Sequence, residues 1–190
     1  MTPSQTLIDL IRKRQTVRQY QEKKVEDHKL SLIIEAARMA PSACNAQGWR
    51  FIVVEDRELL NKINDKGLGG IVANQWARTA PVIITGCYKK DILTHHLGER
   101  AKGIKYHFLD MGIAGEHMAL MAQALGLGTC WIGWFKQGAV KKILGIPRSL
   151  EVVFLMTLGY PREEPRPKSR LPADKIAFKN RFPGQGNVAK

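Results

Sequence analysis

Apolar residues repeat with helical spacing in two places near the N-terminus. The first run covers about residues 4–14 and predicts a helix. In the second run, four apolar residues from Leu30 to Ala37 recur at i, i+3, i+4 and i+7, which places them on one face of a helix. We expect Asp27 to cap this second helix and Pro41 to end it.

Strands are predicted where β-branched and aromatic residues cluster. Residues 49–55, 81–88 and 151–160 have this composition. The last of the three is apolar throughout, which is typical of a strand that is buried on both faces. We expect a short strand or turn at residues 129–135, and a short helix capped by Asp56.

The longest predicted helix covers about residues 104–125. Its few polar residues form two narrow stripes, and Gly126 and Gly128 are expected to end it. A helix that is apolar around most of its circumference is normally buried, either in the centre of the fold or in a subunit interface.

The mixture of helices and strands with short links predicts one domain over residues 1–190, either α+β or a three-layer α/β arrangement. Residues 161–190 are rich in proline and charge. We expect them to form an extended arm without a core of its own. Such an arm needs a surface to lie on, and a second subunit would provide one.

The chain is strongly basic, with a net charge of +13 from 30 Lys and Arg against 17 Asp and Glu. A field of this sign attracts nucleic acid, acidic lipid or phosphorylated small molecules. The basic residues are spread along the chain without an RNA-recognition or helix-turn-helix signature, which disfavours nucleic-acid binding. No apolar run approaches the roughly 20 residues that span a bilayer. We therefore expect a cytoplasmic protein that does not associate with membranes.

Cysteine and histidine spacing argues against disulfides and metal sites. Cys44, Cys87 and Cys130 form no CxxC pair, which fits a reducing compartment. His95 and His96 are adjacent and would face opposite sides of a strand. This spacing leads us to expect no metal site. The sequence also has no phosphate-binding glycine motif and no nucleophile elbow, so we expect neither of those two kinds of site.

Three polar segments are candidates for ligand binding. Residues 14–18 (RQTVR) offer two planar guanidinium groups and a hydroxyl, which suit a phosphate. Residues 41–50 (PSACNAQGWR) offer amides that match the mixed edge of a pyrimidine-like ring. Lys168 and Arg170 can point to one side of an extended stretch. The simpler interpretations are a solvated helix end, a turn that uses Asn for its own backbone, and a charged tail.

Taken in order, four segments resemble the nitroreductase family of flavoproteins over about residues 7–173. RQTVRQY is similar to the family's Arg-x-Ser-x-Arg/Lys-x-Phe segment, and APSACNAQGWRFIVV to its Pro-Ser-x-x-Asn-x-Gln-Pro-Trp strand entry. DMGIAGEHMALMAQALGLGTCWIGWF resembles the family's long helix and the segment beside the flavin. LGYPREEPRPKSRLP resembles its closing strand and Lys-x-Arg arm.

The resemblance implies an α+β fold in which helices flank a central, mostly antiparallel sheet. It also implies an obligate, intertwined homodimer with two FMN sites at the interface, each built from both chains. The electron donor would be NADH or NADPH. FMN carries a dianionic phosphate, and several Arg and Lys residues explain its capture without nucleic acid.

The resemblance also implies a role for individual residues. The phosphate, ribityl chain and ring edge would be held in one chain by Arg14, Thr16, Arg18, Lys168 and Arg170, with Gln15 at a position where the family varies. The other chain would line the ring with Pro41, Ser42, Ala43 and Asn45, with Gln47 nearby. Trp131, Ile132 and Gly133 would pass beside the isoalloxazine, with a backbone N–H of Ile132 or Gly133 facing N5.

Two features depart from the family pattern or add to it. Gly48 stands where the pattern has proline before Trp49, which loosens that turn. Cys44 and Cys130 lie in the segments assigned to the flavin. They are interpreted as small packing residues, with a redox thiol as the alternative.

The implied reaction is a ping-pong transfer of hydride from NAD(P)H through FMN to an electron-poor small molecule, such as a nitroaromatic or a quinone. Three alternatives stay open. One is another flavin reaction of the same family: dehalogenation, flavin fragmentation or dehydrogenation. The others are a flavin-binding protein without turnover and a basic nucleic-acid-binding domain.

Overall fold

The computed structural model describes residues 2–69, 74–89, 103–163 and 168–183. Its centre is a four-stranded sheet with the order β1-β2-β4-β3, in which every neighbouring pair is antiparallel. The strands are β1 (Trp49–Val54), β2 (Val82–Lys89), β3 (Gly128–Ile132) and β4 (Leu150–Gly159). The three predicted long strands and the predicted short strand are therefore confirmed.

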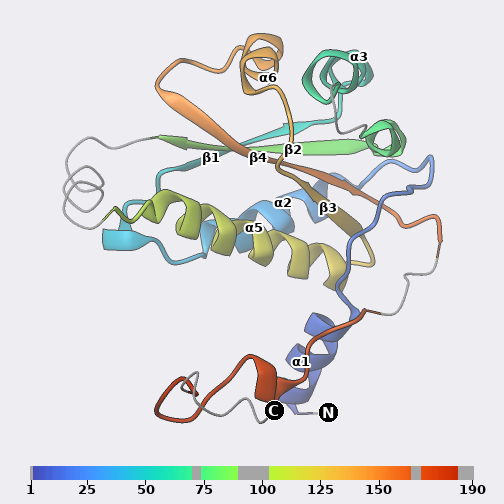
Figure 1. Cartoon of the computed structure of the whole chain (residues 1–190). Coiled ribbons are helices and arrows are strands. Elements are labelled where there is room, and N and C mark those ends of the chain that lie inside the picture. Colours follow the sequence, from blue (N-terminus) through green and yellow to red (C-terminus); the bar gives the residue numbers. More distant parts are fainter. Residues whose placement is uncertain (1, 70–73, 90–102, 164–167, 184–190) are drawn as a thin grey trace, which may run out of the picture.

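Helices cover both faces of this sheet (Figure 1). One face carries α2 (Asp27–Arg38) and α5 (Tyr106–Ala124), and the other carries α3 (Arg57–Lys62) and α6 (Gln137–Leu144). The result is the predicted α+β fold in three layers. The first helix, α1 (Pro3–Lys13), projects away from the layers and lies beside the described part of the C-terminal arm (Figure 1).

Strand β4 lies inside the sheet and supplies side chains to both hydrophobic layers. Phe154, Met156 and Leu158 belong to the core beneath α2 and α5. Leu155 points the other way and belongs to the core beneath α3 and α6. This alternation of buried residues confirms that the apolar strand is buried on both faces.

The predicted cap of α2 is wrong. Glu26 occupies the N-cap position and Asp27 is the first helical residue, where its carboxylate pairs with Lys24 Nζ at 3.2 Å. A carboxylate in the first turn still favours the positive end of the helix dipole. The other predicted cap is confirmed, because Asp56 Oδ1 accepts the Leu59 N–H at 2.8 Å.

The end of α5 is also as predicted, because Gly126 adopts a φ of +75° directly after the last turn. All three cysteines are free. Within the described part of the chain, no helix has the length and apolar character needed to cross a membrane. His95 and His96 lie outside the described residues.

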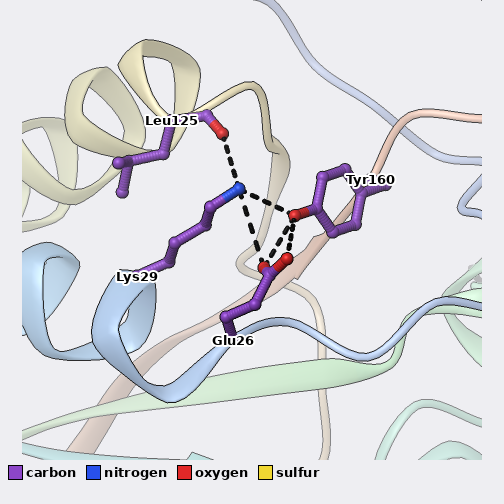
Figure 2. A network of polar contacts seen from close by, with 4 residues as sticks. All are labelled: Glu26, Lys29, Leu125 and Tyr160. Carbon is purple, nitrogen blue, oxygen red and sulfur yellow. Dashed lines mark hydrogen bonds and ion pairs between the residues drawn. The ribbon is translucent and has the colours of Figure 1, made fainter.

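A polar network joins the start of α2, the end of α5 and the end of β4 (Figure 2). The Tyr160 hydroxyl donates to the Glu26 carboxylate at 2.6 Å and accepts from Lys29 Nζ at 2.7 Å. Lys29 Nζ also donates to the Leu125 carbonyl at 3.3 Å. The hydrogen bond from Tyr160, helped by a backbone hydrogen bond and by Lys29, lowers the pKa of Glu26 to about 2.

This network makes stability depend on pH. The folded pKa of Glu26 lies below its ordinary value of 4.5, so the carboxylate stabilises the fold above that pH and loses its contribution as the pH falls towards 2. We expect Glu26→Gln to lower the free energy of unfolding at neutral pH, and the difference from wild type to shrink below about pH 4.5. Urea denaturation across this range measures both.

The control is Asp27→Asn, since that neighbouring side chain is 83% exposed and outside the network. We expect the control to have little effect at any of these pH values. A loss in Glu26→Gln that is equal at neutral and acidic pH would contradict the role assigned to the Glu26 charge.

Candidate functional site

Residues 16 and 17 lie along the outer edge of β3, and residues 19–21 pair with residues 160–162 just past the end of β4. Val17 N–H donates to the Thr129 carbonyl at 2.9 Å, and Thr16 and Thr129 form a parallel bridge. Val17 is buried against Gly128, where an added Cβ would come within 2.4 Å of the valine side chain. Glycine at position 128 therefore allows the N-terminal segment to lie close to the sheet edge.

Charged residues on either side of this pairing contact other elements of the fold. Arg14 Nε pairs with Glu116 Oε1 of α5 at 3.2 Å. The Arg18 guanidinium lies 5.7 Å from the centre of the Trp76 ring, a cation–π contact. Thr16 and Arg18 are exposed while Val17 between them is buried, as alternation along an extended chain requires.

The arm brings two further cations to the same place. Lys168 Nζ donates to the carbonyl oxygens of Arg14 at 2.6 Å and Ile11 at 3.1 Å, at the end of α1. Burial lowers the pKa of Lys168, and the positive charges of Arg14 and Arg170 lower it further. The cation cluster of Arg14, Lys168 and Arg170 is thus a concentration of like charge that favours an anionic ligand.

The side chains at the end of β3 pack into both hydrophobic cores. The Trp131 ring packs over Gly115 of α5, and its centre lies 4.6 Å from the centre of the Phe154 ring. Ile132 is buried in the opposite layer, and Gly133 is exposed. Trp131 and Ile132 therefore use their side chains in the core, which leaves the backbone of residues 131–133 as the part that can face a cofactor.

The loop of residues 41–47 has an unusual backbone. Cys44, Asn45 and Gln47 have φ values of 52°, 52° and 47°, in the left-handed region that non-glycine residues rarely adopt. Ser42 Oγ accepts the Gln47 N–H at 3.0 Å, and Gln47 Nε2 donates to Asn45 Oδ1 at 3.0 Å. Such conformations persist only where the surroundings hold them, and they are concentrated at functional sites.

The structure gathers the predicted residues into two groups. The first lies along β3 and the end of α1: Arg14, Gln15, Thr16, Arg18, Trp131, Ile132, Gly133, Lys168 and Arg170. The second is the loop with Pro41, Ser42, Ala43, Asn45 and Gln47, which lies at the Tyr106 end of α5, away from α1 and the arm (Figure 1). One chain therefore does not bring the two groups together.

Some residues that support the site were not predicted. Glu116 holds Arg14, Trp76 lies beneath Arg18, and Asp110 accepts a hydrogen bond from the loop at Ala43. Asp110 and Glu116 had a weak signal in the sequence, as rare polar residues in the most apolar helix. Trp76 had none, because only the fold brings it near Arg18.

Comparison with known proteins identifies the family. The model of the nitroreductase family matches residues 11–74 and 70–160. This chain belongs to the nitroreductase family. A Thermus thermophilus relative named NADH dehydrogenase is 30% identical and covers 87% of this chain and 92% of its own length. FMN reductase [NAD(P)H] of Bacillus subtilis is 27% identical, with coverages of 91% and 73%.

A solved structure agrees with the family assignment. The FMN-dependent nitroreductase of Clostridium difficile R20291 has a TM-score of 0.77 and 26% identity, and covers 92% of this chain and 99% of its own. This likeness supports the nitroreductase fold with its antiparallel sheet.

The two cysteines in the predicted flavin segments differ in burial. Burial raises the pKa of the Cys130 thiol, and the nearby Arg18 only partly opposes this effect. A raised pKa disfavours the reactive thiolate, so Cys130 fits a packing role. Cys44 is exposed in the loop, and its role stays a prediction.

The contact between Trp131 and α5 can be tested through Gly115. An added Cβ at this position would lie 2.1 Å from the Trp131 ring. We expect Gly115→Ala to lower the free energy of unfolding by roughly 1–3 kcal/mol, because the ring has to shift. The control is Gly138→Ala in α6, which has open space around it and should leave stability unchanged or slightly higher. Equal stability of the two variants in urea denaturation would contradict this packing.

Proposed function

We propose that this protein is a homodimeric FMN-dependent oxidoreductase that transfers hydride from NADH or NADPH to an electron-poor small molecule, such as a nitroaromatic or a quinone. Membership of the nitroreductase family supports the reaction class, and the relatives' names include an FMN reductase and an FMN-dependent nitroreductase. The observation that carries the proposal is the cation cluster of Arg14, Lys168 and Arg170, which lies next to the pairing of Thr16 with Thr129 at the start of β3.

The cluster fits the phosphate of FMN in charge and in donors. Burial and, after it, the charges of Arg14 and Arg170 lower the pKa of Lys168, and a dianionic phosphate would relieve the part that is due to repulsion. Lys168 uses two of its three N–H donors on backbone carbonyls, and the third is available to a phosphate oxygen. Arg14 pairs with Glu116 through Nε and retains its terminal nitrogens for bidentate binding.

Other residues would orient the ring. The backbone of residues 131–133 would lie beside it, with an N–H of Ile132 or Gly133 towards N5. The amides of Asn45 and Gln47 would meet its polar edge. Bound FMN supplies the hydride chemistry. The cationic surroundings favour a reduced cofactor that carries negative charge, which helps hydride acceptance.

A second copy of the chain would complete the site. The loop and the cation cluster lie apart in one chain, so a loop from a partner is needed to reach the cluster (Figure 1). Apolar side chains are also left exposed on α5, at Phe108, Leu109 and Ile113. A groove between α1, α2 and α5 is lined mainly by apolar residues, among them Leu10, Leu32, Met39, Leu120 and Met121, together with Glu35 and His117. Surfaces of this kind mark subunit interfaces.

Cofactor reduction tests the proposal directly. The purified protein should be yellow with about one FMN per chain, and anaerobic NADH or NADPH should bleach the flavin spectrum. Reoxidation by a nitroaromatic or a quinone, followed in the same cuvette, would then identify the acceptor class. A protein that takes up no added FMN would refute the proposal, and a bound flavin that neither nicotinamide reduces would support a flavin-binding protein without turnover.

Phosphate recognition can be tested at Lys168. Lys168→Met removes one charged donor while keeping the apolar stem, and we expect FMN affinity to fall roughly 10- to 100-fold, as for loss of a charged hydrogen bond. Riboflavin, which lacks the phosphate, should bind both proteins with similar affinity. Lys175→Met in the exposed part of the arm is the control. A parallel fall in riboflavin affinity would mean that Lys168 acts on the fold and not on the phosphate.

A further inference from the structure

The loop of residues 42–47 is tied to the body of the protein through a buried carboxylate. Ala43 N–H donates to Asp110 Oδ1 at 3.0 Å, and Asp110 is only 3% exposed on α5. Cys44, Asn45 and Gln47 follow Ala43 and have left-handed φ values. The loop backbone is therefore strained and requires an anchor. A hydrogen bond to a buried charge is a strong anchor of this kind.

The second oxygen of the same carboxylate is held by a tyrosine. The Tyr88 hydroxyl donates to Asp110 Oδ2 at 3.1 Å, and Tyr88 is fully buried at the end of β2. Each oxygen of Asp110 thus accepts a hydrogen bond, one from the loop and one from the sheet. A buried carboxylate needs such partners, since an unpaired one would be costly.

The position of the tyrosine ring depends on Gly48. A Cβ added at Gly48 would lie 2.4 Å from Tyr88 Cζ, and two more ring carbons would be within 2.8 Å. Gly48 also accepts the Lys89 N–H through its carbonyl at 2.8 Å, which holds the loop exit beside the end of β2. Any larger residue at position 48 would therefore collide with the ring.

We propose that Gly48, Tyr88 and Asp110 form a clamp that holds the 42–47 loop in its strained conformation. Gly48 leaves room for the tyrosine ring, Tyr88 orients the carboxylate, and Asp110 fixes the loop at Ala43. This clamp rests on the proposed function in one respect: it would set FMN affinity by holding the loop ready for the ring. Tyr88 and Asp110 are positioning residues, since each acts through the loop.

Two conservative variants test the clamp. Tyr88→Phe removes the hydroxyl and keeps the ring, and Asp110→Asn keeps the shape and removes the charge. Hydrogen exchange of the 42–47 amides in the FMN-free protein measures how firmly the loop is held. An FMN titration then measures the effect of the loop on cofactor affinity. We expect faster exchange in both variants and FMN binding weakened roughly tenfold or more. The double variant should be no worse than the more damaged single variant, because the residues act in series.

Met118→Ala is the control for a general loss of stability. Met118 is fully buried on the same helix, about two turns beyond Asp110. The Met118→Ala substitution should lower the melting temperature without changing hydrogen exchange in the loop or the affinity for FMN.

Wild-type loop exchange and wild-type FMN affinity in Tyr88→Phe and Asp110→Asn would overturn the clamp, whatever happens to their melting temperatures. If the wild-type protein itself binds no FMN, the proposed function fails, and loop exchange alone still decides the clamp.

Discussion

The pairing of Thr16 and Val17 with the outer edge of β3 is the contact on which the candidate site depends. It places Arg14 at the end of α1 beside α5, and it brings Arg18 next to the ring of Trp76. The arm returns to the same place, where Lys168 donates to the last carbonyls of α1. Without this pairing, the cations would be spread along a flexible N-terminus and arm, and would not form a cluster that can bind a phosphate.

In the proposed function, each chain holds two incomplete halves of a site. The cation cluster lies along β3, whereas the strained loop at Asn45 lies at the other end of α5 (Figure 1). The apolar surface of α1 and α5 is then easier to understand, because it would be buried when a second copy joins the halves. Part of the high positive charge would then serve as a counterpart to the phosphate of the proposed cofactor.

Much of the fold could be predicted because it depends on local pattern. Hydrophobic spacing located α2 and α5, and β-branched runs located three strands. The cap at Asp27 was wrong by one residue, although Asp is the better N-cap residue in sequence. The helix begins after Glu26, whose carboxylate binds Tyr160 from a distant segment and Lys29. Motif resemblance supplied the predicted site residues, but it did not indicate that the Trp131 side chain packs against the core. Contacts that join distant segments, such as Tyr88 with Asp110, leave no local pattern to read.

The most direct test of this account asks whether one site uses two chains. Lys168→Glu damages the phosphate side and Asn45→Trp fills the ring side at an exposed position. Each variant alone should lose FMN while remaining folded and dimeric. In an isolated heterodimer of the two, one site carries both defects and the other carries none, so the account predicts about one FMN per heterodimer. A heterodimer that binds no FMN would show that both halves of the site come from the same chain and would contradict it.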